Sequence, residues 1–99
     1  MSTCIVIVEG TLEEGGADTQ EFKEYLQRAI ANDKEHGGVE LENYMISENL
    51  GQGEKPDFVV VLKYPSYEAA KKTFTSDEYK AITPLRDKAF KKVKILLTN

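Results

Sequence analysis

Short apolar runs recur along the chain at lengths that suit strands. Two of these runs, Thr3–Glu9 and Phe58–Tyr64, are almost unbroken and rich in β-branched residues. Two others, Val39–Ser47 and Lys91–Thr98, mix apolar with polar positions, and the last one alternates them. β-branched runs of this length are typical of strands. The pattern therefore predicts four strands, with a bulge in the second where its apolar phase changes at residues 44–46.

Helical patterns fill the two longer intervals between these strands. In the first interval, Asp18 and Glu21 form a capping box, and the helix is expected to end at Gly37. In the second interval, Ser66 caps one helical piece and Ser76 caps another. The later piece contains a proline that is expected to start a helical segment or to kink it. The apolar stripe expected on the core side of the first helix consists of Phe22, Leu26, Ala29 and Ile30.

The order of these elements, β-α-β-β-α-β, is the ferredoxin-like plan of α+β proteins. The right-handed crossover rule then places the strands of a four-stranded antiparallel sheet in the order 4-1-3-2, with the helices on one face. The two continuous apolar runs take the central positions of that sheet, and the two more polar runs take its edges. A chain of 99 residues has enough apolar material for one core, so we expect a single domain over residues 1–99.

The two central strands are apolar on both faces, although the predicted helices can cover only one face of the sheet. The other face would expose a large apolar patch of a kind that soluble monomers rarely carry. We therefore expect a homodimer in which two sheets pack face to face about a two-fold axis. The alternative is a monomer whose long loops partly cover this face.

Charge and cysteine content narrow the range of partners and locations. Seventeen acidic against thirteen basic residues give a net charge of −4, which repels a phosphate backbone, so nucleic acid is not an expected partner. The single cysteine, Cys4, lies in an apolar run and is interpreted as a structural core residue.

No apolar run approaches the roughly 20 residues that span a bilayer, so no membrane association is expected. Residues 1–8 lack the basic start of a signal peptide, so we expect a cytoplasmic protein.

Four side chains are candidates for chemistry. His36 is the only histidine in the chain, and histidine is the side chain that titrates nearest to neutral pH. It is therefore a candidate catalytic proton carrier. Alternatively, it interacts with the dipole at the end of the first helix. Arg86 suits catalytic, bidentate binding of a carboxylate or enolate; alternatively, it pairs with an acid such as Asp87. Tyr64 and Tyr79 are candidate ligand-binding residues that donate a hydroxyl group into an apolar pocket; alternatively, they form the edge of the core.

Other kinds of site have little support in the sequence. One histidine and one cysteine cannot form a zinc site, and the acidic residues lack the spacing of a calcium loop, so no metal is expected. The glycine-containing segment of residues 10–16 lacks the lysine and the hydroxyl residue of a phosphate-binding loop. We therefore expect no bound cofactor. Ser66 and Ser76 are interpreted as helix caps because no nucleophile elbow surrounds them.

Three ordered motifs connect the chain to a known family. They are Tyr64-Pro65-Ser66-Tyr67-Glu68-Ala69-Ala70, Thr75-Ser76-Asp77-Glu78-Tyr79 and Pro84-Leu85-Arg86. In these motifs the chain resembles a mostly bacterial family catalogued as a domain of unknown function, DUF1330, over most of its length. That family is similar to the dimeric α+β barrel superfamily, which includes cofactor-less monooxygenases, haem-degrading enzymes, muconolactone-type isomerases and effector-binding domains. The resemblance implies a dimeric α+β barrel and transfers no activity, because a fold does not specify a function.

Haem degradation is disfavoured among the activities of that superfamily, because the chain has no tryptophan and its only histidine follows the first helix. We expect a protein that binds a small, carboxylated organic compound in a cleft between sheet and helices. As an enzyme it would be a cofactor-independent isomerase, monooxygenase or lyase, in which Arg86 orients the ligand, Tyr64 or Tyr79 donates a hydrogen bond and His36 moves a proton. The alternative is a non-catalytic ligand sensor or stress-associated homodimeric module.

Overall fold

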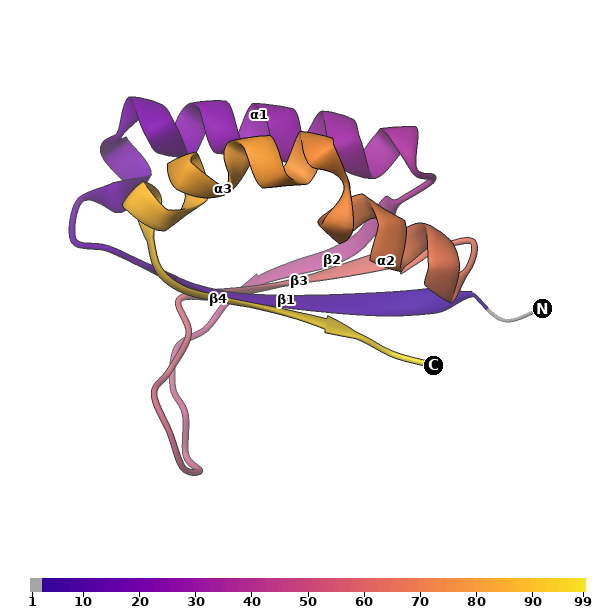
Figure 1. Cartoon of the computed structure of the whole chain (residues 1–99). Coiled ribbons are helices and arrows are strands. Elements are labelled where there is room, and N and C mark those ends of the chain that lie inside the picture. The colour runs from indigo at the N-terminus through magenta and orange to yellow at the C-terminus, as the bar shows by residue number, and fades with distance from the viewer. Residues whose placement is uncertain (1–2) are drawn as a thin grey trace.

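The computed structural model describes residues 3–99, which form a sheet with all of its helices on one face (Figure 1). No helix within this range combines the length and the apolar character needed to cross a membrane. The elements are β1 (Cys4–Leu12), a short 3₁₀ turn (Gly16–Asp18), α1 (Gln20–Glu35), β2 (Val39–Met45), β3 (Phe58–Tyr64), α2 (Tyr67–Thr75), α3 (Asp77–Ala89) and β4 (Phe90–Leu97).

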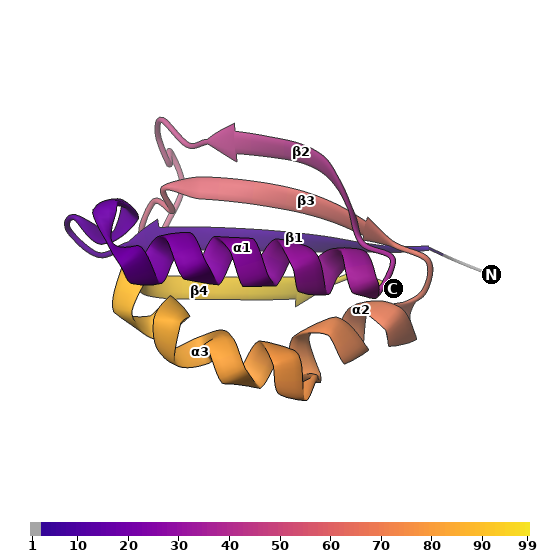
Figure 2. The same ribbon diagram turned by 90° about the horizontal axis from the view of Figure 1, so that it is seen from above.

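The sheet has the strand order β2-β3-β1-β4, and each pair of neighbouring strands is antiparallel. This order confirms the predicted ferredoxin-like α+β fold, with the two continuous apolar runs at the centre. β1 pairs with β3 so that Val6 lies opposite Leu62, and it pairs with β4 along its other edge. Seen from above, α1 lies over the β1 and β4 side of the sheet, and β2 and β3 extend beyond it (Figure 2).

The core lies between the sheet and the helices, because alternate strand residues point to that side. Val6, Leu62 and Tyr64 are buried there against Ala70 of α2. Cys4 is buried in the same cluster with a free thiol, as the sequence predicted. A second cluster, under α1 and α3, contains Tyr25, Tyr79, Ile82, Ala89 and Phe90.

Local capping interactions set the starts of the helices. The Thr19 hydroxyl caps α1 by accepting a hydrogen bond from the backbone N–H of Phe22 at 3.1 Å. The prediction of Asp18 as the cap is wrong, because Asp18 belongs to the preceding 3₁₀ turn and the helix begins one residue later. Ser66 and Ser76 cap α2 and α3, as predicted.

The ends of the helical regions follow from backbone chemistry. α1 ends at Glu35, and Gly37 takes a positive φ of 84°, which glycine adopts without a Cβ penalty, so the predicted stop at this glycine is confirmed. Pro84 lies inside α3, which continues to Ala89. It therefore does not start a separate helical segment, because α3 already begins at the cap on Ser76.

The second strand contains a bulge, but not where the sequence placed it. The register between β2 and β3 shifts between Glu40 and Glu42, so Leu41 is the extra residue. Beyond the bulge the pairing is regular to Met45, so the predicted bulge at residues 44–46 is wrong. The apolar phase changes at 44–46 because the earlier bulge has already reversed which side chains face the helices.

The face of the sheet opposite the helices is apolar at its centre. Ile5, Ile7, Val59 and Val61 belong to this face, because their neighbours in sequence point toward the helices. Within the described part of the chain no helix lies on this side, and the loop of residues 46–57 projects from it (Figure 1). We call it the bare face of the sheet.

Candidate functional site

A cleft opens between α1 and the helix face of the sheet, and residues of all four strands line it. Its volume is about 450 Å³, within the range of pockets that hold small organic ligands. The lining is mostly aliphatic and aromatic, and a few polar groups interrupt it. The residues that line it are Val8, Leu12, Ala17, Phe22, Tyr25, Leu26, Ala29, Ile30, Asp33, Glu40, Asn43, Met45, Phe58, Val60, Leu62, Phe74, Tyr79, Phe90, Val93 and Ile95.

The shape of the cleft explains why the expected apolar stripe of α1 is only partly buried. Leu26 and Ile30 are 37% and 51% exposed, because their side of the helix overhangs the open cleft and does not pack on the sheet. The prediction that both face the core is therefore wrong. The helix buries Tyr25 and Asn32 in their place.

Two tyrosine hydroxyl groups meet in the lining of the cleft. Tyr25 of α1 and Tyr79 of α3 are both buried, and their hydroxyl oxygens lie 2.8 Å apart in a hydrogen bond. Arg86, two turns after Tyr79 on α3, donates a hydrogen bond from Nη1 to the Tyr79 hydroxyl at 3.3 Å. Its guanidinium carbon lies 5.8 Å from the centre of the Tyr79 ring. Arg86 also contacts Asp87, with Nε and Oδ1 3.1 Å apart.

A carboxyl group lies further along α1. Asp33 accepts a hydrogen bond from the Tyr64 hydroxyl at 2.8 Å and also lines the cleft. Burial raises the pKa of the Asp33 carboxyl to about 6, and the negative charge of Glu40 adds to the rise. The hydrogen bond from Tyr64 and the charge of His36 lower this pKa, but burial outweighs them. The cleft therefore contains a carboxyl group that changes its charge just below neutral pH.

The structure separates the four candidate residues by position. Tyr79 lines the cleft, and Tyr64 is fully buried behind Asp33. Arg86 is not among the lining residues, and its link to the cleft is the hydrogen bond to the Tyr79 hydroxyl. It also forms an ion pair with Asp87, as the alternative interpretation of Arg86 expected. His36 caps the C-terminal end of α1, where its Nδ1 lies 2.9 Å from the Asn32 carbonyl oxygen, and it does not line the cleft.

Sequence reasoning missed Tyr25, Asp33, Glu40 and Asn43, although each is a polar residue in the lining. Tyr25, Ala29 and Asp33 follow a spacing of four residues, which places them on one side of the helix. That spacing was available in the sequence. Which residues this side of the helix faces depends on where α1 lies over the sheet, and the spacing does not contain that information.

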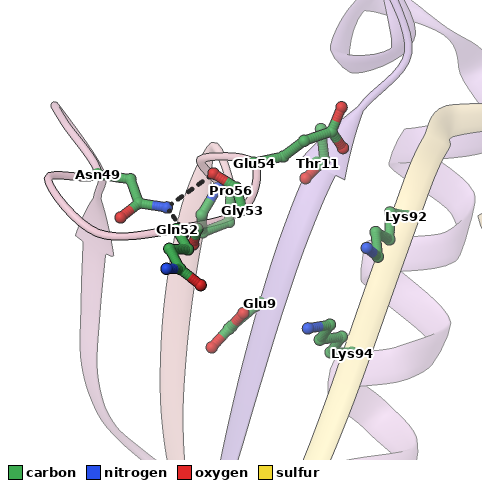
Figure 3. Close-up of a pocket in the computed structure, with 9 residues that line it drawn as sticks. All are labelled: Glu9, Thr11, Asn49, Gln52, Gly53, Glu54, Pro56, Lys92 and Lys94. Atoms are coloured by element: carbon green, nitrogen blue, oxygen red, sulfur yellow. Dashed lines mark hydrogen bonds between the residues drawn. The ribbon is translucent and has the colours of Figure 1, made fainter.

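A second hollow, of about 320 Å³, lies on the bare face (Figure 3). Glu9 and Thr11 of β1 and Lys92 and Lys94 of β4 form its floor, and the loop of residues 46–57 forms its wall. Glu9 is paired with Lys94 across the two strands, so opposite charges already face each other there. Within residues 3–99, no group of three histidine, cysteine or acidic side chains is arranged to hold a metal ion.

A four-stranded antiparallel sheet covered on one face by helices, with an apolar cleft beneath the first helix, defines a ferredoxin-like α+β protein. The family described as a domain of unknown function (DUF1330) matches residues 15–99, and the chain belongs to this family. No curated protein matches the chain.

Several solved structures share the fold at low sequence identity. A protein of unknown function from Rhodopseudomonas palustris is 17% identical, with a TM-score of 0.78 over 97% of this chain and 80% of that one. A dimeric ferredoxin-like protein of unknown function from Jannaschia sp. CCS1 is 10% identical, with a TM-score of 0.71 over 99% of both chains. SnoaB, a cofactor-independent oxygenase from Streptomyces nogalater, is 11% identical, with a TM-score of 0.67 over 100% of this chain and 93% of that one. These likenesses establish the fold.

Proposed function

We propose that this protein binds a small, largely apolar organic molecule in the cleft under α1 and acts on it as a cofactor-independent isomerase, monooxygenase or lyase. The observation that carries the proposal is an apolar cleft of about 450 Å³ that holds a carboxyl group with a pKa of about 6. A site of this kind combines the room for a ligand with a group able to accept a proton near neutral pH. The cofactor-independent oxygenase with the same fold is consistent with this class of chemistry.

The charges around the cleft favour an uncharged ligand. Asp33 and Glu40 contribute carboxylates to the lining, and Arg86 is engaged with Tyr79 and Asp87. The sequence suggested a carboxylated compound. Its carboxylate would meet the like charges of Asp33 and Glu40, and within residues 3–99 the lining contains no lysine or arginine to balance them. We therefore replace it with a neutral compound whose polar groups are few.

The proposed roles of the residues follow from their positions. Asp33 accepts the proton, because it lines the cleft and its pKa of about 6 leaves it mostly ionised at neutral pH. Tyr79 donates a hydrogen bond to the ligand, and Arg86 positions Tyr79. Tyr64 positions Asp33 through its hydroxyl group. In this proposal His36 has no contact with the ligand, since it does not line the cleft and its Nδ1 lies against the Asn32 carbonyl oxygen.

Homodimer formation through the bare face is part of the same proposal. The apolar centre of that face, around Ile7 and Val61, and a dimeric protein with the same fold both support it. A partner on the bare face would leave the cleft open, since the cleft lies on the helix side of the sheet. The acidic composition and the single free cysteine are consistent with a cytoplasmic location.

A non-catalytic ligand sensor is the second candidate. The hydrogen bond from Tyr64 already occupies Oδ1 of Asp33, which favours a carboxyl group with a structural role. Such a protein would bind the same molecules in the same cleft and would show no turnover. Loss of proton exchange from a bound ligand on Asp33→Asn substitution separates the enzyme from the sensor, since a sensor has no exchange to lose.

Binding is tested with a naphthalene-sized probe, 2-ethylnaphthalene, whose own fluorescence reports its transfer into an apolar site. Ala29→Phe places a ring in the cleft lining and is expected to weaken binding at least tenfold. Ala81→Phe makes the same change on an exposed position of α3 and is the matched control, expected to bind as the unmodified protein does. Equal binding by both variants, or no binding by the unmodified protein, would contradict the proposal.

A further inference from the structure

The hydroxyl pair in the cleft has a hydrogen atom for which the protein supplies no acceptor. Tyr25 and Tyr79 bring two hydroxyl hydrogens, and one of them forms the bond between the two oxygens. Arg86 can only donate, so its bond to the Tyr79 oxygen consumes no hydrogen of the pair. Among residues 3–99 the two hydroxyl groups have hydrogen bonds to each other and to Arg86 alone. One hydroxyl hydrogen is therefore left over, whichever tyrosine donates to the other.

The surroundings direct this hydrogen toward a ligand. Both residues line the cleft and both side chains are buried, so an acceptor for the remaining hydrogen has to come from within the cleft. A buried donor without an acceptor costs free energy, which a ligand oxygen in the cleft would recover. The pair is thus a preformed donor site for an acceptor atom.

The chain of donors also favours negative charge on that acceptor. The guanidinium of Arg86 donates into the Tyr79 oxygen, which polarises the hydroxyl pair and strengthens the bond that the pair donates. Arg86 itself is paired with Asp87, whose side chain is 67% exposed and is well solvated. Donors arranged in this way stabilise an oxygen on which charge develops, because they are in place before the reaction.

We propose that the substrate is an uncharged carbonyl compound whose carbonyl oxygen accepts the remaining hydrogen bond of the Tyr25–Tyr79 pair. This inference rests on the proposed function and specifies its substrate class. Asp33 lies eight residues after Tyr25 on the same side of α1, roughly 12 Å further along the helix axis. Its charge acts on Tyr25, where it contributes to raising the pKa of the phenol after burial and Tyr79. The cleft therefore holds a hydrogen-bond donor and a carboxylate at different points along α1, and probes of naphthalene size are chosen to fill the space between them.

The reaction that this arrangement supports is removal of a proton from a carbon conjugated with the carbonyl group. The C–H bond breaks, its proton moves to the free oxygen of the Asp33 carboxylate, and its electron pair moves through the conjugated system to the carbonyl oxygen. The resulting enolate oxygen is held by the hydroxyl pair. Return of the proton from Asp33 to the same or another carbon of the enolate completes exchange or isomerisation, with no other reactant needed.

The substrate class is tested with two probes that differ in one group, 2-acetylnaphthalene and 2-ethylnaphthalene. A hydrogen bond to the carbonyl from a charge-supported donor predicts that the ketone binds about tenfold more tightly or better. The infrared carbonyl band of the bound ketone, labelled with carbon-13, is expected at lower frequency than that of the same ketone in an apolar solvent. The band responds to hydrogen bonding at the oxygen and does not depend on turnover.

The decisive variant is Tyr25→Phe combined with Tyr79→Phe, because either single variant leaves one hydroxyl hydrogen without an acceptor. The double variant is expected to lose the preference for the ketone and the band shift, while it still binds 2-ethylnaphthalene, which shows that the cleft remains folded. Tyr67→Phe, at an exposed position of α2, is the matched control and is expected to keep both.

The possible failures of the two proposals are distinguishable. Equal affinity of the unmodified protein for both probes, or a preference and band shift that persist in the double variant, would overturn the carbonyl assignment and leave the binding cleft in place. Failure of both probes to bind the unmodified protein would overturn the proposed function and, with it, this inference.

Discussion

Asp33 is the residue on which the proposed chemistry depends, and its ionisation is governed by two opposing contacts. Removal from water disfavours the carboxylate, and the hydrogen bond from Tyr64 favours it. The result is a pKa raised from 3.8 to about 6. A carboxylate in a mainly apolar lining is costly for stability, and such costs are typical of groups retained for function.

The raised pKa of Asp33 has a definite consequence for stability. Between pH 4 and 6 the folded protein binds more protons at this site than the unfolded chain does, so stability falls as pH rises through this window. Asp33→Asn should abolish this part of the pH dependence. It should also raise the free energy of unfolding at pH 7 by on the order of 1 kcal/mol, after allowance for the partial exposure of the group.

Thermal unfolding at pH 4, 5, 6 and 7 measures this effect. Asp18→Asn, at an exposed position of the 3₁₀ turn, is the matched control and should leave the profile between pH 4 and 6 unchanged. An Asp33→Asn variant that retains the full pH dependence of the unmodified protein would show that Asp33 titrates at its ordinary pKa.

At the scale of elements, the placement of α1 sets the cleft, and its start is set by Thr19. Thr19→Ala removes the acceptor for the Phe22 N–H and should lower the free energy of unfolding by about 1 kcal/mol. Asp18→Ala, at the cap that the sequence suggested, should cost much less. Urea unfolding of the two variants compares them directly, and a larger loss for Asp18→Ala would contradict the observed cap.

The elements could be predicted from the sequence better than the site could. Strand order follows from the order of the elements and the crossover rule, and the starts of α2 and α3 follow from the local capping signals at Ser66 and Ser76. The bulge at Leu41 and the position of α1 over the sheet depend on packing between distant segments. They decide that Asp33 lines a cleft, so this part of the site could not be predicted from spacing.

At the scale of the whole molecule, the two faces of the sheet have separate proposed roles. The helix face holds the cleft, and the bare face holds an apolar centre for a second copy of the chain. An arrangement of this kind lets a dimer form without closing either cleft. Each subunit would then bind its ligand independently of the dimer contact.

Ile7→Lys tests the dimer. It places a lysine at the centre of the bare face, and two-fold symmetry brings two such charges into the interface, so dimer affinity should fall more than a hundredfold. Native mass spectrometry measures the subunit stoichiometry and also reveals any retained small molecule. Ile30→Lys, at a position of α1 that is 51% exposed, should remain dimeric. A monomeric unmodified protein at micromolar concentration, or a dimeric Ile7→Lys variant, would contradict this arrangement.

The central claim is that the ligand site lies on the helix side of the sheet, and nuclear Overhauser effects between bound 2-acetylnaphthalene and assigned methyl groups test it most directly. We predict contacts to Val60 of β3 and Ile95 of β4, whose side chains line the cleft. Contacts restricted to Ile7, Val61 and other methyl groups of the bare face would contradict the claim.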